Sequence, residues 1–160
     1  IDIYADRPTL NAIDQRFGYV LEPLAPEANG FYYKPCLTPH EIDGPFSVGG
    51  INVTPFEQGH GFMNTLGFRF GPVAYSTDVV ELSDAAFAAL DGVEVWIVDC
   101  LRQHPHVTHA HLEKTLAWIE RVKPKRAVLT HMSFEMDYET TQSRLPAGVE
   151  AGYDGLMIEA

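Results

Sequence analysis

The sequence predicts an α/β domain in which a mixed β-sheet carries helices on its outside. From Val48 to Thr77, short alternating segments follow one another with little room for helices, which is typical of β-hairpins. After Asp78, helical and strand-like segments alternate to the end of the chain, as in α/β units. The 160 residues suffice for one domain with a real core and are too few for two ordinary domains.

The first half of the chain is predicted to be mainly β-strand. Asp6 to Pro8 are predicted to be a helix start, and apolar residues at helical spacing from Thr9 to Phe17 indicate one short helix, which Gly18 closes. The turn-forming residues at 39–45 are expected to be a connection. Strands are predicted at 1–5, from 31 to about 37, and at 46–48, 51–56, 65–70 and 73–76.

The second half is predicted to alternate between helices and buried strands. Ser83 or Asp84 caps a helix that runs through Leu90. Thr108 is a plausible N-cap for a second helix at 109–122, which Pro124 prevents from continuing. Buried strands are predicted at 93–98 and 127–129, a helix at 138–144, and a final strand at 155–159.

Composition excludes several classes of protein. The net charge of -11 argues against a broad nucleic-acid-binding surface. No apolar run approaches the roughly 18 residues of a membrane span, and the start has no signal-peptide pattern. Cys36 and Cys100 form no C-x-x-C pair and are expected to be reduced thiols of a cytoplasmic protein. The first residue is not Met and opens a strand-like pattern, so we expect the chain to be part of a longer protein.

Three predicted strands end in a residue that can bind a metal or transfer a proton. Asp78 follows the strand at 73–76, Asp99 follows the strand at 93–98, and His131 lies just beyond the strand at 127–129. Ligands in open α/β sheets gather at the carboxyl ends of strands. One histidine at such a position is more often structural, but three such endings together indicate a site.

His60 lies between two glycines, which let the backbone approach a ligand closely. Asp78 lies 18 positions later, beyond one hairpin, so the two side chains can face each other across one rim. Imidazole and carboxylate suit zinc, manganese or iron(II) and suit calcium poorly. A hairpin loop with a solvated histidine is the alternative interpretation.

Two H-x-H pairs follow, at His104 and His106 and at His109 and His111. Either pair could chelate a metal, although a surface loop is the favoured interpretation for the first. His109 opens a predicted helix, where free N–H groups favour anions, so it could hold or protonate a phosphate oxygen. The sequence contains no G-x-S-x-G elbow, P-loop or dinucleotide-binding G-x-G-x-x-G motif.

Six segments, in this order, resemble the later motifs of the metallo-β-lactamase superfamily. They are Gln-Gly-His-Gly at 58–61, Leu-Gly-Phe-Arg-Phe at 66–70, Ala-Tyr-Ser-Thr-Asp at 74–78, Val-Asp-Cys-Leu-Arg at 98–102, Thr-His-Ala-His-Leu at 108–112 and Leu-Thr-His-Met-Ser at 129–133. With Gly-Tyr-Asp-Gly-Leu-Met-Ile at 152–158, the chain most resembles the cyclic-phosphate phosphodiesterases of phosphonate degradation (PhnP-type). The resemblance implies an αββα sandwich, of which residues 1–160 would be the C-terminal portion.

The resemblance also implies roles for individual residues. His60 is similar to the histidine that completes the first metal's ligands, Asp78 to a carboxylate that bridges two metals, and His131 to the last histidine of the second metal. His109 corresponds to a histidine that contacts the phosphate and donates a proton. Asp99 and His111 are candidates for supporting these groups or the substrate. The implied cofactors are two divalent ions, with zinc or manganese favoured.

The superfamily's first motif, H-x-H-x-D-H, is absent from this sequence, and His109-Ala-His111 lacks the Asp-His that should follow. We therefore expect a metal-dependent phosphodiesterase of small cyclic or nucleotide-like phosphates in the complete protein. The isolated chain should bind metal weakly, have little turnover and form homo-oligomers through exposed apolar surface and strand edges. The alternatives are a transfer-RNA 3′-processing endonuclease, another superfamily hydrolase of thioesters or lactones, and a non-catalytic binding domain; no membrane partner is expected, and nucleic acid is disfavoured.

Overall fold

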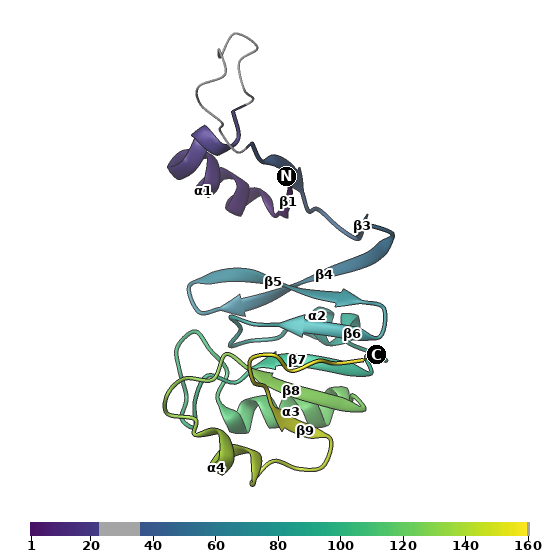
Figure 1. The fold of residues 1–160 in the computed structure, drawn as a ribbon, viewed down its shortest axis with the longest axis vertical. Helices are drawn as coiled ribbons and strands as arrows, with labels where there is room; N and C mark the ends of the chain where they lie inside the picture. Colours follow the sequence, from purple (N-terminus) through teal and green to yellow (C-terminus); the bar gives the residue numbers. More distant parts are fainter. Residues whose placement is uncertain (23–35, 160) are drawn as a thin grey trace. The chain divides into compact units, whose positions relative to one another are not determined.

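The computed structural model describes residues 1–22 and 36–159, in two units. The first unit, Ile1–Phe46, is a small α/β element (Figure 1). It contains β1 (Asp2–Ala5), α1 (Arg7–Phe17), the 3-10 turn η1 (Gly18–Val20) and β2 (Thr38–Glu41), and β1 pairs with β2 in parallel. The second unit, Ser47–Ala160, contains the sheet that carries the candidate site.

For the first unit, the helix start predicted at Asp6 to Pro8 is confirmed, and the connection predicted at 39–45 needs revision. The helix begins at Arg7 because the side chain of Asp6 accepts a hydrogen bond from the Thr9 N–H group (3.0 Å). The segment from Thr38 to Glu41, predicted as turn, is a strand. Pro39 is tolerated there because, among the described residues, β2 pairs only with β1, so one edge of the strand needs no N–H donor. The strand predicted at 31–37 lies largely outside the described residues.

The larger sheet has seven strands in sequence order, from β3 to β9 (Figure 1). They are β3 (Phe46–Val48), β4 (Ile51–His60), β5 (Met63–Phe70), β6 (Val73–Ser76), β7 (Val95–Asp99), β8 (Arg126–Thr130) and β9 (Val149–Ala151). β4, β5 and β6 are antiparallel neighbours, whereas β6, β7, β8 and β9 are parallel. It follows that β4, β6, β7 and β8 run in the same direction and end at the same edge.

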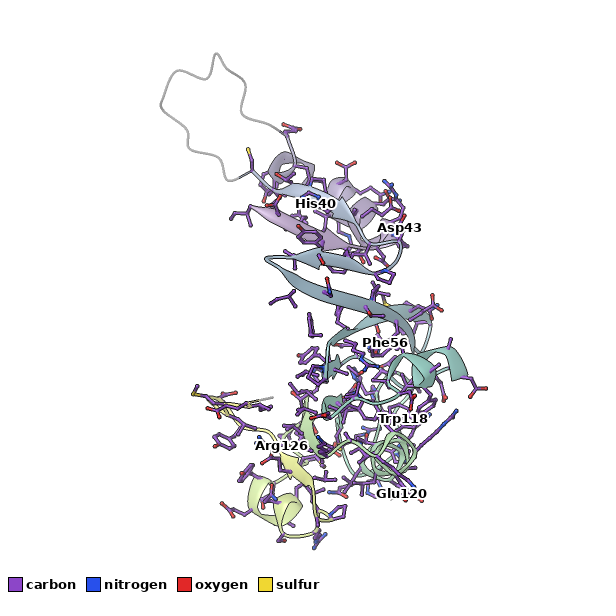
Figure 2. All side chains as sticks on the ribbon, turned by 90° about the vertical axis from the view of Figure 1, so that its right-hand side faces the viewer. His40, Asp43, Phe56, Trp118, Glu120 and Arg126 are labelled. Atoms are coloured by element: carbon purple, nitrogen blue, oxygen red, sulfur yellow. The ribbon has the colours of Figure 1, made fainter. Side chains whose placement is uncertain are left out.

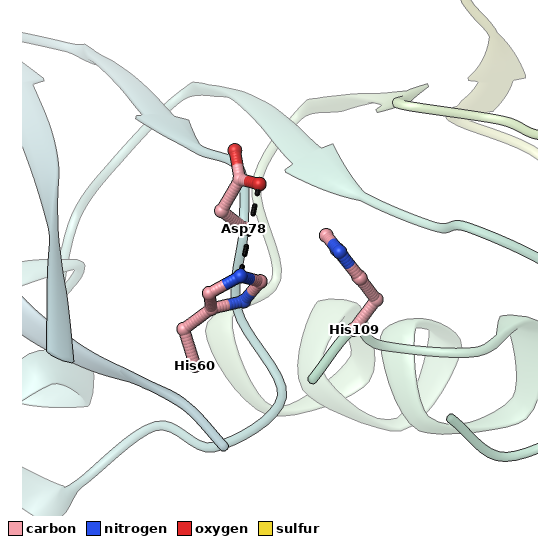
Figure 3. A group of neighbouring side chains, drawn as sticks. All are labelled: His60, Asp78 and His109. Carbon is pink, nitrogen blue, oxygen red and sulfur yellow. Dashed lines mark ion pairs between the residues drawn. The ribbon is translucent and has the colours of Figure 1, made fainter. Parts of the chain in front are cut away.

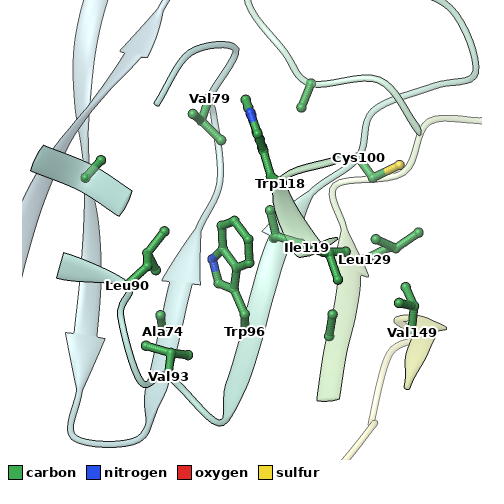
Figure 4. Close-up of a cluster of buried hydrophobic side chains, with 14 of the residues drawn as sticks. Ala74, Val79, Leu90, Val93, Trp96, Cys100, Trp118, Ile119, Leu129 and Val149 are labelled. Atoms are coloured by element: carbon green, nitrogen blue, oxygen red, sulfur yellow. The ribbon is translucent and has the colours of Figure 1, made fainter. Parts of the chain in front are cut away.

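The helices α2 (Asp84–Ala89) and α3 (Leu112–Val122) bury side chains into one core with the inner residues of β6 to β8 (Figure 4). Trp96 is fully buried, and its indole N–H donates to the Ser76 hydroxyl (3.0 Å). Trp118 of α3 packs into this core, while Glu120 on the same helix is exposed (Figure 2). Each large side chain buried here contributes roughly 1.5–3 kcal/mol to folding, which fixes the strands that carry the site.

Several helix and strand boundaries differ from the sequence prediction; β4, for example, continues to His60, beyond its predicted end at Phe56. The helix predicted at 109–122 begins only at Leu112, and Thr108 is not its N-cap. The helix that begins at Tyr138, α4 (Tyr138–Gln142), is shorter than predicted. The final strand predicted at 155–159 is absent, and the strand lies at Val149–Ala151 instead, because the later segment finds no ladder partner among the described residues. None of the helices in the described part of the chain has the length and hydrophobicity required for a membrane span.

Gly67 provides a test of the packing at the centre of β4 and β5. It pairs with Phe56, and a Cβ atom at Gly67 would lie 2.5 Å from the Phe56 ring Cζ and 2.7 Å from the Gln58 Oε1. We expect Gly67→Ala to lower the free energy of unfolding by about 1–3 kcal/mol, measured by urea denaturation. Gly44→Ala is the control, because no atom lies within 4 Å of its Cβ position. Equal stability of the two variants would contradict this packing.

Candidate metal centre

The common direction of the strands brings four predicted site residues to one edge of the sheet. His60 ends β4, Asp78 follows β6 by two residues, Asp99 ends β7 and His131 directly follows β8. The register confirms the alignment of the parallel strands, since Ser76 pairs with Val98 and Asp99 pairs with Thr130. The loop after β7 then returns His109 to the same edge (Figure 3).

His60, Asp78 and His109 form a group that could hold a metal ion. Each offers one ligand atom, and these atoms all lie within 4.8 Å of one another (Figure 3). The Nε2 of His60 lies 4.0 Å from the Asp78 Oδ1. The other ring nitrogen of His60, Nδ1, lies 2.8 Å from the Thr108 carbonyl oxygen. Because that nitrogen must carry the proton to donate to a carbonyl, the Nε2 lone pair is left available to a metal.

Asp78 and His131 both adopt left-handed backbone conformations, with φ of 55° and 61°. Non-glycine residues rarely take positive φ, and such a conformation costs of order 1–3 kcal/mol. The chain thus turns sharply where β6 and β8 reach the edge. A hydrogen bond from the Thr65 hydroxyl to the Asp78 carbonyl (2.8 Å) braces the first of these turns.

His109 is positioned by a buried carboxylate and not by a helix terminus. Its Nδ1 lies 2.9 Å from the Oδ2 of Asp99, which is fully buried and also accepts the Val79 N–H (3.1 Å). Burial raises the pKa of the Asp99 carboxyl, and the hydrogen bonds from Val79 and His109 act in the opposite direction. The expectation that His109 lies at the start of a helix is wrong, because α3 begins at Leu112. Its Nε2 is the nitrogen left for a ligand or substrate.

His131 reaches the same edge, beside His109. The two rings are stacked with centroids 4.8 Å apart, and the His109 ring also contacts the His60 ring edge-on, with centroids 4.7 Å apart. Among the described residues, however, the group of atoms close enough to share one ion contains His109 and not His131. The ligand role of His131 and the proton-donor role of His109 therefore stay predictions.

The remaining histidines of the loop lie outside this group. The Nδ1 of His106 accepts the Thr108 N–H (3.3 Å), and its ring centroid is 5.3 Å from that of His109. His111 lines a cavity of about 370 Å³ beside Gly59 and Gly61. The backbone carbonyl of His104 accepts a hydrogen bond from Arg102 (3.2 Å).

Gln58 is a structural residue of the site that the sequence analysis missed. It is buried, and its amide donates to the Thr65 hydroxyl (3.2 Å) and to the Thr77 carbonyl (2.5 Å). These bonds join β4 and β5 to the residue that precedes Asp78. The signal was available, because Gln58 shares one strand face with Phe56 and His60, where an uncharged polar residue is unexpected.

The donor set fits a transition-metal ion. Two imidazoles and one carboxylate suit zinc or manganese, and the hydrogen bond at the His60 Nδ1 is the support that metal-binding histidines usually have.

Residues 1–132 match the family model of the Beta-lactamase superfamily domain. Among solved structures, a diphosphatase from the PhnP family is 29% identical with a TM-score of 0.87, over 99% of this chain and 58% of that chain. Zn(2+)-bound PqqB from Methylobacterium extorquens is 16% identical, with a TM-score of 0.72, over 100% of this chain and 65% of that chain. The short form of human tRNase Z is 14% identical, with a TM-score of 0.62, over 99% of this chain and 67% of that chain.

One curated protein, an octanoyltransferase from Porphyromonas gingivalis, is 27% identical over 158 residues, which are 96% of this chain and 31% of that protein. The chain therefore spans less than two thirds of the curated relative and of the PhnP-family structure. The two solved structures below 25% identity support the fold alone.

Replacing Asp78 by glycine removes its carboxylate but allows the same backbone conformation, so the two contributions can be measured separately. Glycine adopts positive φ without strain, so we expect Asp78→Gly to change the free energy of unfolding by less than about 1 kcal/mol. Loss of the carboxylate should weaken zinc binding at least about tenfold in calorimetric titration, in line with the cost of losing a ligand or its support. Lys123→Gly is the matched control, because Lys123 has the same φ of 55° at the end of α3. Unchanged zinc affinity in Asp78→Gly would exclude Asp78 as a ligand.

Proposed function

The chain belongs to the metallo-β-lactamase superfamily, and on that premise we propose that the complete protein is a metal-dependent hydrolase of small phosphodiesters. The observation that carries the proposal is the convergence of His60, Asp78 and His109 at one edge of the sheet. The resemblance to the superfamily implies that the metal ions bind at this edge. The similarity to a PhnP-family diphosphatase, at 29% identity, supports a phosphate ester as the substrate.

His60 and Asp78 would hold the metal, together with His131 and with residues outside this chain. Bound divalent cations would supply Lewis acidity at the phosphate. Two ions require more donors than the described residues bring together, since each zinc ion takes about four. We therefore propose that the isolated 160-residue chain binds metal weakly and has little turnover.

His109 is proposed to protonate the leaving alkoxide. In the hydrolysis, a water oxygen forms a bond to phosphorus, the bond from phosphorus to the leaving oxygen breaks, and that oxygen takes a proton. The buried Asp99 carboxylate accepts the His109 Nδ1–H and orients the ring, so a proton on Nε2 can be directed at the leaving group. The attacking water gives up one proton to solvent, and a proton from solvent returns to the His109 Nε2, so the protons balance.

A transfer-RNA 3′-processing endonuclease is the second candidate. The support for this candidate is the fold shared with human tRNase Z, but an identity of 14% does not indicate that the two proteins share an activity. The net charge of -11 also disfavours a long polyanionic substrate. The octanoyltransferase matches over 31% of its length, so its name gives no support for acyl transfer here.

The proposed activity is tested in the complete, metal-loaded protein. We expect hydrolysis of a cyclic phosphodiester and of bis(4-nitrophenyl) phosphate, and no faster cleavage of precursor transfer RNA. His60→Ala should lower kcat/KM at least about 100-fold, because loss of a metal ligand reduces both metal binding and the activity that depends on the metal. His104→Ala is the control, because His104 lies outside the group of His60, Asp78 and His109; it should change kcat/KM by no more than about twofold. Selective cleavage of the transfer RNA would favour the second candidate instead.

The proton-donor role of His109 predicts a dependence on the leaving group. His109→Ala should lower kcat by about 10²–10⁴-fold for a diester with an alkoxide leaving group, the usual effect of general acid catalysis. The loss should be much smaller for 4-nitrophenolate, which leaves without a proton.

Asp99→Asn should lower kcat about 10–100-fold for the diester with an alkoxide leaving group and much less for the 4-nitrophenyl ester, because Asp99 acts through His109. Equal losses for both leaving groups would show that His109 binds metal rather than delivering a proton.

A further inference from the structure

The two most exposed aromatic rings among the described residues both lie next to the candidate site. Phe134 is 97% exposed and Phe62 is 88% exposed. Phe62 follows His60 by two residues, and Phe134 follows His131 by three. A single exposed apolar side chain is common on protein surfaces and needs no explanation. Here, however, each ring is held on an ordered turn at the edge that carries the site.

The turn that carries Phe62 is fixed in place. Gly61 and Phe62 form the two-residue connection between β4 and β5, closed by the pair of His60 and Met63. Gly61 has a φ of +71°, and a Cβ atom there would lie 2.8 Å from Thr108 Cγ2. The tip of the hairpin therefore packs closely against the segment that leads to His109. Val107 in that segment is also exposed.

The turn that carries Phe134 is anchored on both sides. The Ser133 N–H donates to the Leu101 carbonyl (2.9 Å), and the Met136 N–H donates to the Ser133 carbonyl (2.9 Å). The Ser133 hydroxyl also accepts the Glu135 N–H (3.3 Å), and the Met136 side chain is buried. An ordered turn that presents a bare aromatic ring to solvent keeps an unfavourable exposure that a ligand would relieve.

Phe62 and Phe134 closely follow, in the sequence, the two histidines whose rings contact the His109 ring. His109 lies between His60 and His131, with ring centroids 4.7 Å and 4.8 Å away. A phosphodiester bound along this row carries ester groups that project beyond the phosphate. We propose that Phe62 and Phe134 bind a planar aromatic group of the substrate, so that the preferred substrates are phosphodiesters of a nucleoside. This inference rests on the proposed function and names the residues that select the substrate.

A small ligand fits these rings better than a protein surface does. The sequence neighbours of Phe134 on both sides, Ser133 and Glu135, are polar, so the turn offers one apolar side chain between two polar ones. Aromatic stacking on a base is tolerant of base identity and needs few side chains. A nucleic-acid strand would require many phosphate contacts, which the net charge of -11 disfavours.

Two esters with one leaving group test the inference. Thymidine 5′-(4-nitrophenyl phosphate) and methyl 4-nitrophenyl phosphate both release 4-nitrophenolate, and only the first carries a base. In the complete, metal-loaded protein, Phe62→Ala or Phe134→Ala should lower kcat/KM for the thymidine ester about tenfold, mainly through KM. Both variants should change kcat/KM for the methyl ester by no more than about twofold. Phe62→Tyr and Phe134→Tyr keep the ring and should retain most of the activity.

Phe70→Ala is the control, because Phe70 is a partly exposed ring at the opposite end of β5. Equal losses on the two esters, no loss on either, or a marked fall in the melting temperature of both alanine variants would overturn the inference. If the parent protein hydrolyses neither ester, the proposed function fails, and binding of thymidine 5′-monophosphate then decides the role of the rings. About tenfold weaker binding in the Phe62 and Phe134 variants, measured by calorimetry, would support it, and unchanged binding would refute it.

Discussion

The shared direction of β4, β6, β7 and β8 is the constraint on which the candidate site depends. His60 and His131 are 71 positions apart in the sequence, yet both contact the His109 ring because their strands end at one edge. The antiparallel β5 makes this possible, since it returns the chain so that β6 starts parallel to β4. Reversing any one of these strands would send its final residue to the opposite edge of the sheet.

Strand direction alone does not aim the side chains, and the turns beyond the strands supply the rest. Asp78 and His131 leave their strands through left-handed conformations, each at a cost of order 1–3 kcal/mol. The buried core around Trp96 offsets that cost, because every large side chain placed there contributes a similar amount in the opposite sense. The hydrogen bond from His60 to the Thr108 carbonyl then links the turn after β4 to the loop that carries His109.

The sequence predicted the ends of β6, β7 and β8 to within one residue because they depend on local periodicity, whereas β4 continues four residues beyond its predicted end to His60. Asp78, Asp99 and His131 were assigned to the carboxyl ends of strands from the apolar runs before them, and the structure places them there. Features that depend on distant partners were not predictable in the same way. The β2 strand forms because β1 pairs with it, the segment at 155–159 forms none without a partner, and the position of His109 is set by Asp99 and not by the nearby helix.

Asp99 supports this edge as the candidate functional end of the domain. Its Oδ1 has no hydrogen-bond partner among the described residues, and burial raises the pKa of the carboxyl, so an apolar residue would stabilise the core more. Its Oδ2, however, holds both the Val79 N–H and the His109 ring, and so fixes the turn after β6 together with the imidazole. A buried carboxylate, two strained turns and two exposed aromatic rings thus lie at one edge of the sheet. Features that lower the stability of a fold are usually found where the protein binds a ligand or catalyses a reaction. Their presence at this edge is therefore the physical reason to propose that the chemistry takes place there.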